Sequence, residues 1–197
     1  MIGNCANFGN SITHKNRIVI PDNDSISFVN KKFAMSFWLN LSAIRFDASV
    51  YGNISWFLNK RNDSDNLEYQ CGIVNGELFA GLFNNGGKTS YIHRKAGNYS
   101  FLNKWTNIIF SYNNTNNGYG LHIYANGIEI STTSSDIGTF TSLSNTNTPL
   151  ILGQASWNLG FAPLLGKMCE YYIYDNAVTP EQALFIYNEG LAGRSLI

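Results

Sequence analysis

One short segment of the sequence combines the residue types that bind a neutral sugar. Trp157 and Asn158 lie between an apolar run that ends at Gly153 and another that begins at Lys167, so we expect them on a loop. A neutral sugar offers CH patches and hydroxyl groups but no charge, and an aromatic face beside an amide matches both. Trp157 and Asn158 are therefore candidate glycan-binding residues. The alternative is that the Trp157 ring only packs within its loop.

A second candidate binding surface lies on a predicted strand. In Leu121-His122-Ile123-Tyr124, successive side chains point to opposite faces of a sheet. If Leu121 and Ile123 face the core, then His122 and Tyr124 form a polar, aromatic surface on the other face, which we take as a second candidate ligand-binding site. An ordinary exposed sheet face would produce the same pattern.

Two aspartates are candidate metal ligands. Asp63 and Asp65 alternate with other oxygen-bearing side chains in the segment 62–66, and Ca²⁺ prefers oxygen ligands. Ca²⁺ is therefore the candidate cofactor. The segment lacks the downstream glycine and bidentate glutamate of an EF-hand, so that any site would be irregular, and a solvated turn is the alternative. The segment 22–24 has the same two interpretations, and the preceding Pro21 makes a turn sufficient there.

The sequence lacks the patterns on which hydrolytic enzymes depend. Glycoside hydrolysis uses two carboxylates at a working separation, but the glutamates are scattered singly along the chain. They are Glu68, Glu77, Glu129, Glu170, Glu181 and Glu189. No Gly-x-Ser-x-Gly motif is present, and His14, His93 and His122 lie far apart without metal-ligand spacing. We therefore expect a binding protein and not an enzyme.

Length and charge narrow the class of protein further. At 197 residues we expect one domain spanning residues 1–197, and charged residues make up only 13% with a net charge of zero. Without a basic run the chain is not expected to bind nucleic acid, and without an apolar stretch of membrane-spanning length it is not expected to insert into a membrane. The first residues also lack the pattern of a secretory signal.

The elements that must position these residues are mostly strands. Short apolar or alternating runs predict about twelve of them. They are 17–20, 25–29, 33–41, 54–59, 67–74, 77–83, 89–94, 105–113, 119–125, 128–133, 149–153 and 167–175. Asn75-Gly76 and Asn126-Gly127 predict type I′ hairpin turns. Thr179-Pro180-Glu181-Gln182 predicts the capped start of one helix, which we expect to end at Gly190. The expected fold is a two-sheet antiparallel β-sandwich with a short C-terminal helix.

The three cysteines permit at most one disulfide. Cys5, Cys71 and Cys169 include no C-x-x-C pair, which excludes a zinc cluster. Three buried thiols are the simplest interpretation. If the first and last strands pair, however, Cys5 and Cys169 would lie close enough to form a disulfide.

Several segments in order resemble laminin G-like, concanavalin A-like jelly-roll domains. They are FAMSFWL (33–39), LNKWTNIIF (102–110), LHIYANG (121–127), LILG (150–153), GKM (166–168), YDNAVTPE (174–181) and IYN (186–188). The resemblance implies a jelly roll in which Trp38 and Trp105 occupy packing positions. Similar domains often carry Asp in the strand after Gly-Lys-hydrophobic, whereas this chain has Cys169 there, so a calcium site at that position is not expected.

Such sandwiches serve as lectins, adhesion modules, glycosidase scaffolds and virion surface proteins. The leading hypothesis is a non-catalytic carbohydrate-binding or adhesion module whose partners are cell-surface glycans or polysaccharides. The alternative is a virion surface protein, such as a phage capsid decoration or tail-fibre component, with capsid or tail proteins as partners. It rests on the missing export signal and on a C-terminal segment, 188–195, that looks like the ends of such domains in phage-type proteins. Both hypotheses place the chain outside cells or on a virion surface.

Overall fold

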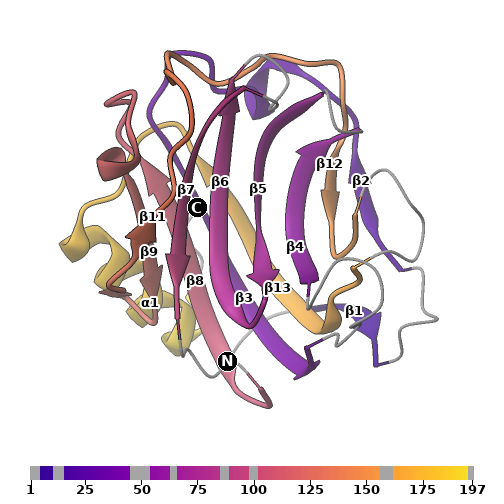
Figure 1. Cartoon of the computed structure of the whole chain (residues 1–197). Coiled ribbons are helices and arrows are strands. Elements are labelled where there is room, and N and C mark those ends of the chain that lie inside the picture. Colours follow the sequence, from indigo (N-terminus) through magenta and orange to yellow (C-terminus); the bar gives the residue numbers. More distant parts are fainter. Residues whose placement is uncertain are drawn as a thin grey trace.

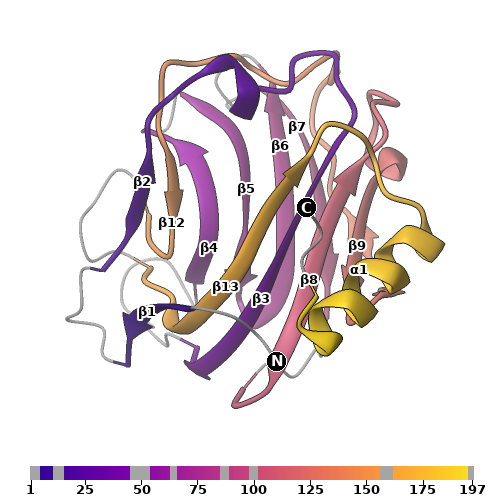
Figure 2. The ribbon, with the colours of Figure 1, turned by 180° about the vertical axis from the view of Figure 1, so that it is seen from behind.

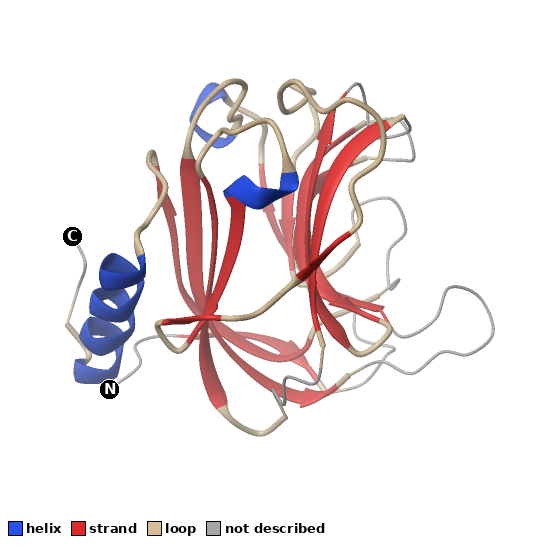
Figure 3. Ribbon diagram, turned by 60° about the vertical axis from the view of Figure 1, so that its left-hand side comes forward, coloured by secondary structure: helices blue, strands red, loops and turns tan. Residues whose placement is uncertain are grey.

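The fold is a sandwich of two antiparallel sheets (Figure 1). The structure is a computed structural model that describes residues 5–10, 16–44, 54–62, 66–84, 89–97, 102–155 and 162–194. Within these ranges thirteen strands form one sheet of six and one of seven, and Figure 3 shows the two layers facing each other with a helix outside one of them. The predicted sandwich is confirmed.

The six-stranded sheet has the order β1-β13-β3-β8-β9-β10. Its strands are β1 (Cys5–Gly9), β3 (Phe33–Ala43), β8 (Trp105–Tyr112), β9 (Leu121–Ala125), β10 (Ile128–Glu129) and β13 (Leu165–Tyr174). Along β3, Phe33, Met35 and Phe37 belong to the core cluster, whereas Trp38 and Asn40 do not. This period of two is the alternation expected of a strand with one buried face, and it leaves the second group on the outer face.

The seven-stranded sheet has the order β11-β7-β6-β5-β4-β12-β2. Its strands are β2 (Ile18–Ile20), β4 (Ile54–Arg61), β5 (Leu67–Val74), β6 (Glu77–Asn84), β7 (Ser90–Ala96), β11 (Thr133–Ser134) and β12 (Leu150–Leu152). Both predicted hairpin turns are confirmed. Asn75 and Gly76 have φ of 53° and 81° between β5 and β6, and Asn126 and Gly127 have 51° and 77° between β9 and β10.

Aromatic rings form much of the core between the sheets. Phe33 lies 4.3 Å, centroid to centroid, from the stacked ring of Phe28 and about 6 Å from Tyr69, Phe110 and Tyr112. These rings come from both sheets and from the segment that precedes β3. Ring contacts across the interface therefore hold the two layers together.

The structure differs from the predicted strands in two places near the N-terminus. The segment 25–29 is not a strand, because residues Asp24–Ile26 form a 3₁₀ turn, η1. The side chain of Asn23 accepts a hydrogen bond from the Ser25 N–H at 2.9 Å, and this local bond competes with pairing in a sheet. The turn interpretation of residues 22–24 is thus confirmed. Conversely, β1 was not predicted, because its sequence CANFG contains no apolar run and it forms by pairing with β13.

Helix α1 (Pro180–Ala192) lies on the outer face of the six-stranded sheet (Figure 2). Its predicted capping box is present, with Thr179 and Gln182 bonded reciprocally. The predicted end is wrong, because the helix continues past Gly190 to a left-handed Gly193 with φ of 66°. Gly190 is required for packing and not for ending the helix. A Cβ at that position would lie 2.5 Å from Trp38 Nε1, so glycine allows the helix to approach the sheet.

α1 packs over one part of the sheet. Ala183 and Ile186 cluster with Ala34, Ile109 and Tyr124 of strands β3, β8 and β9.

Among the helices in the described ranges, none has the length and apolar character that crossing a membrane requires.

The cysteines pair at the edge of the six-stranded sheet. Cys5 and Cys169 are direct cross-strand partners in β1 and β13 and form a disulfide. Cys71 is free and buried in the core, where burial raises the pKa of its thiol. The expectation of three buried thiols is therefore wrong, and the alternative that paired Cys5 with Cys169 is confirmed.

Candidate functional site

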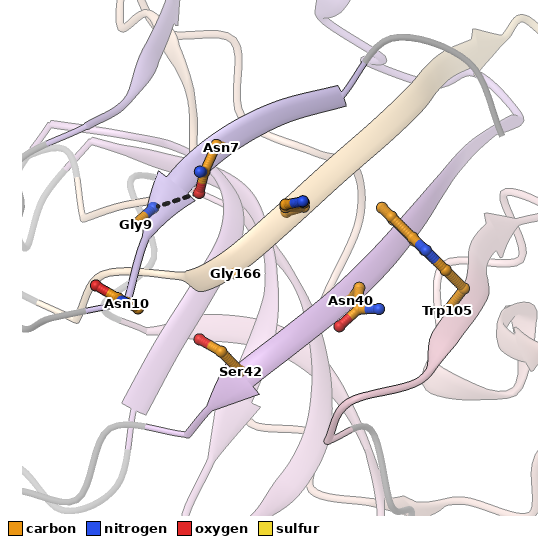
Figure 4. Close-up of a pocket in the computed structure, with 8 residues that line it drawn as sticks. Asn7, Gly9, Asn10, Asn40, Ser42, Trp105 and Gly166 are labelled. Atoms are coloured by element: carbon orange, nitrogen blue, oxygen red, sulfur yellow. Dashed lines mark hydrogen bonds between the residues drawn. The ribbon is translucent and has the colours of Figure 1, made fainter.

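A pocket opens on the outer face of the six-stranded sheet, beside the part that α1 covers. Its volume is about 380 Å³. It is lined by Asn7, Gly9, Asn10, Asn40, Ser42, Trp105, Gly166 and Lys167, which come from β1, β3, β8, β13 and the residue after β1 (Figure 4). We call it the Trp105 pocket.

The strand register places four of the lining residues in one row. Asn7 is paired with Lys167, Lys167 with Asn40, and Asn40 with Trp105. Directly opposed residues of neighbouring strands project from the same face of a sheet. With strands about 4.8 Å apart, the row is about 14 Å long. It therefore forms a continuous polar strip with an indole ring at one end.

The neighbouring row marks where the open surface ends. Two residues further along each strand, Cys5 pairs with Cys169, Cys169 with Trp38, and Trp38 with Asn107. Trp38 is stacked on Tyr187 of α1 at 5.6 Å between ring centroids. The disulfide and the Trp38 ring, which α1 covers, therefore form the border between the Trp105 pocket and the part of the sheet under the helix.

Glycines bring the strands close together at the floor of the pocket. Gly166 has a φ of 144°, and a Cβ there would collide with the carbonyl oxygen of Asn40. At the end of β1, Gly9 has a φ of 99°, and its N–H donates to Asn7 Oδ1 at 3.0 Å. This bond holds the Asn7 side chain at the pocket rim and leaves its amide NH₂ available as a donor.

The chemistry of the lining suits an uncharged, hydroxylated ligand. Asn7, Asn10 and Ser42 are exposed and Asn40 is half-buried, so that amide and hydroxyl groups with both donors and acceptors face the solvent. Trp105 is half-buried and contributes an aromatic surface. Lys167 is the one charged side chain among the eight lining residues. The pocket offers hydrogen bonds and stacking with little fixed charge.

Trp105 does not lie in the core, although the resemblance implies a packing position for it. Its side chain is half-buried, whereas Trp38 and Trp56 are buried. Trp105 is the first residue of β8, and the strand alternation that buries Thr106 turns the indole outward. Of the other lining residues, Asn40 also lies on the outward face of its predicted strand. Nothing in the sequence indicated that Asn7 and Asn10 line a pocket, because β1 was not predicted.

Four predicted site residues lie outside the described residues. They are the candidate glycan-binding residues Trp157 and Asn158 and the candidate calcium ligands Asp63 and Asp65. In the part of the chain that the structure describes, no group of three or more His, Cys, Asp or Glu side chains is arranged to hold a metal ion. The roles of these four residues stay predictions.

The other two predicted residues lie together on β9. Leu121 and Ile123 are in the core, so the predicted alternation of this strand is confirmed. His122 and Tyr124 line a second pocket of about 480 Å³ between β9 and the start of α1. Tyr124 is buried under α1, so the expected open surface formed by both residues is wrong. His122 Nδ1 is 2.7 Å from Glu129 Oε1, and burial, with Glu129 and Glu181 nearby, raises the pKa of Tyr124 to about 12. Their role in binding a ligand stays a prediction.

An aromatic cluster occupies the outer face of the seven-stranded sheet. His93 on β7 is stacked on Tyr91 at 4.1 Å between ring centroids and meets the edges of Phe79 and Phe83 at 4.7 and 5.4 Å. Gly81, paired with His93, leaves room for these rings. Burial, with a smaller contribution from Lys95, lowers the pKa of His93 to about 4. His93 is therefore neutral in the folded protein at neutral pH.

We expect this histidine to make the protein less stable in mild acid. Between pH 6.5 and 4 the unfolded chain binds a proton at His93 that the folded chain does not, so the free energy of unfolding falls as the pH is lowered through this range. With allowance for partial exposure, the expected loss is about 2 kcal/mol. Urea unfolding of wild type and His93→Phe at several pH values would measure it. An unchanged slope in His93→Phe would contradict the prediction.

Comparison with known proteins agrees with the fold. The two sheets and the open polar pocket on one outer face place the chain in the class of jelly-roll sandwich domains. The family model Laminin_G_3, described as "Concanavalin A-like lectin/glucanases superfamily", matches residues 13–183. The chain belongs to this family, as its sequence motifs predict. Among curated proteins, a sequence comparison finds no significant match.

Solved structures share the fold at low sequence identity. The binding domain of Paraclostridial Mosquitocidal Protein 1 is 20% identical with a TM-score of 0.67, over 91% of this chain and 42% of that one. The binding domain of botulinum neurotoxin serotype G is 15% identical with a TM-score of 0.62, over 91% and 41%. The SAP-like pentraxin of Limulus polyphemus is 14% identical with a TM-score of 0.54, over 87% and 81%. The chain thus spans about two fifths of the length of the two toxin domains.

Proposed function

We propose that this chain is a non-catalytic module that binds glycans, and that the Trp105 pocket is its binding site. The observation that carries the proposal is the row Asn7, Lys167, Asn40 and Trp105 on one exposed sheet face. A sugar ring can stack its CH face on the indole of Trp105 while its hydroxyl groups bond the two amides. Lys167 adds a donor to a hydroxyl group. No step of this recognition needs covalent chemistry.

The family and its structural neighbours support a binding role. The family description includes lectins, and the two toxin domains are named as binding domains. We infer that this chain acts outside the cell on a glycan of a cell surface or polysaccharide. The virion surface role remains the second hypothesis, with a capsid or tail protein as the partner in place of a sugar.

A glycan array with multivalent display would test the proposal, because avidity makes weak single-site binding visible. We expect Trp105→Ala to lower the affinity for the preferred sugar by at least about tenfold, which corresponds to 1.4 kcal/mol and is typical of a lost stacking contact. Phe185→Ala is a matched control, because Phe185 is an exposed aromatic residue on α1. It should bind like wild type.

Other outcomes point to other sites. Unchanged binding by Trp105→Ala would exclude the Trp105 pocket, and a loss caused instead by Trp157→Ala would place the sugar at that loop. A signal that disappears with EDTA and returns with Ca²⁺ would support the proposed calcium ligands Asp63 and Asp65. If no glycan binds the wild-type array, the glycan proposal is wrong and a protein partner becomes the better hypothesis.

A further inference from the structure

Lys60 on β4 is a fully buried lysine. Its side chain has a relative exposure of 0%, whereas lysine is almost never fully buried unless its charge is paired. The Nζ atom is 2.6 Å from Asp22 Oδ1, 2.6 Å from Glu68 Oε1 and 3.1 Å from the carbonyl oxygen of Thr146. An amine thus lies between two carboxyl groups in the interior of the protein.

The two carboxyl groups differ in their surroundings. Glu68, on the neighbouring strand β5, is fully buried, and its Oε1 also accepts hydrogen bonds from the N–H and hydroxyl of Thr146 at 2.7 and 2.9 Å. Asp22 lies on the turn after β2, and 26% of its side chain is exposed. Glu68 is therefore held in place, whereas Asp22 has direct access to solvent.

We propose that Lys60 and Asp22 condense to form an intramolecular amide cross-link, with Glu68 as the catalytic residue. Glu68 takes one proton from the Lys60 ammonium, and the nitrogen lone pair then attacks Cγ of Asp22. A carboxyl oxygen of Asp22 leaves as water after it receives two protons, one returned by Glu68 and one released by the attacking nitrogen. One C–N bond forms and one C–O bond breaks, no electrons are exchanged with another molecule, and Glu68 ends as it began.

Three features of the site favour this reaction. The fold holds nitrogen and carboxyl group in contact, and well-oriented intramolecular groups reach effective concentrations of about 10⁵–10⁸ M. Two carboxylates against one ammonium are costly to keep charged in the interior, and proton transfer followed by condensation replaces an ion pair with a neutral amide. The exposure of Asp22 gives the released water a path to solvent, which the buried Glu68 lacks.

The cross-link would strengthen an edge of the seven-stranded sheet. β2 has three residues and pairs with β12, which in turn pairs with β4. A covalent bond between Asp22 and Lys60 would join the end of this short edge strand to β4 across β12. If the N-terminal part of the chain were pulled, a covalent bond as well as hydrogen bonds would then resist the separation of β2 from the sheet. This role is independent of the glycan proposal.

Mass spectrometry of the intact, reduced chain tests the proposal. We expect the wild-type mass to be lower than the sequence mass by one water, and a protease digest to contain one branched peptide that joins Asp22 to Lys60. Lys60→Met, Asp22→Ala and Glu68→Gln should each have the full mass of their sequences. Asp24→Asn changes an exposed carboxylate on the same turn and should still lack one water.

Clear results would overturn the proposal. A wild-type chain of full sequence mass would show that the cluster is only an ion pair network. A missing water that persists in Lys60→Met, or that maps to a cyclised aspartate elsewhere, would show that the loss has another origin. Because the digest is made on the wild-type chain, the test does not depend on whether any variant folds.

Discussion

Reduction of the Cys5–Cys169 disulfide is expected to weaken glycan binding more than tenfold and to lower the free energy of unfolding by about 2–4 kcal/mol. The bond joins residues separated by 164 positions, so it strongly restricts the unfolded chain. It also attaches β1, an edge strand of five residues, which supplies Asn7, Gly9 and Asn10 to the Trp105 pocket. When β1 detaches, one side of the pocket is lost.

Denaturant unfolding and glycan titration with and without a thiol reductant would measure both effects. The double variant Cys5→Ser/Cys169→Ser should match the reduced wild type and should not respond to reductant. Cys71→Ala keeps the disulfide and should still respond, which separates the bond from the buried thiol. Full glycan affinity after complete reduction would show that β1 is not part of the binding site.

The second large effect concerns the buried cluster around Lys60. We expect Glu68→Ala to lower the free energy of unfolding by about 3–5 kcal/mol, because it prevents the proposed cross-link, leaves the buried Lys60 amine without its buried partner and frees the donors of Thr146. The double variant Lys60→Met/Glu68→Leu leaves no buried charge stranded and should have a higher free energy of unfolding than Glu68→Ala. Apolar side chains of similar size avoid the cost of a stranded charge.

A double-mutant cycle of Lys60→Met, Glu68→Leu and the combined variant would measure the coupling in urea. Asp24→Asn is again the control and should unfold like wild type, because Asp24 is exposed on the same turn. If Glu68→Ala unfolds like wild type, or if the double variant loses as much as the two single variants added together, the two residues are not coupled as the structure implies.

Local patterns of the sequence were sufficient for most of the architecture. The strand pattern of 33–41, the alternation in 121–124, the two Asn-Gly turns and the capping box at Thr179 each depend on residues close together in the chain, and each is confirmed. Physical preferences of this kind act over a few residues, so they can be read without the fold. The same segments in order also indicated the family.

Residues brought together from distant parts of the chain required the tertiary structure. β1 and its disulfide depend on pairing with β13. Gly190 lies inside α1 and not at its end, because a residue without a side chain is needed where the helix contacts Trp38. The Trp105 pocket combines β1, β3, β8 and β13, and the Lys60 cluster combines a turn, two strands and the loop around Thr146. Register between distant strands decides which side chains share a face, and a shift of one residue would have placed Asn40 and Trp105 in the core.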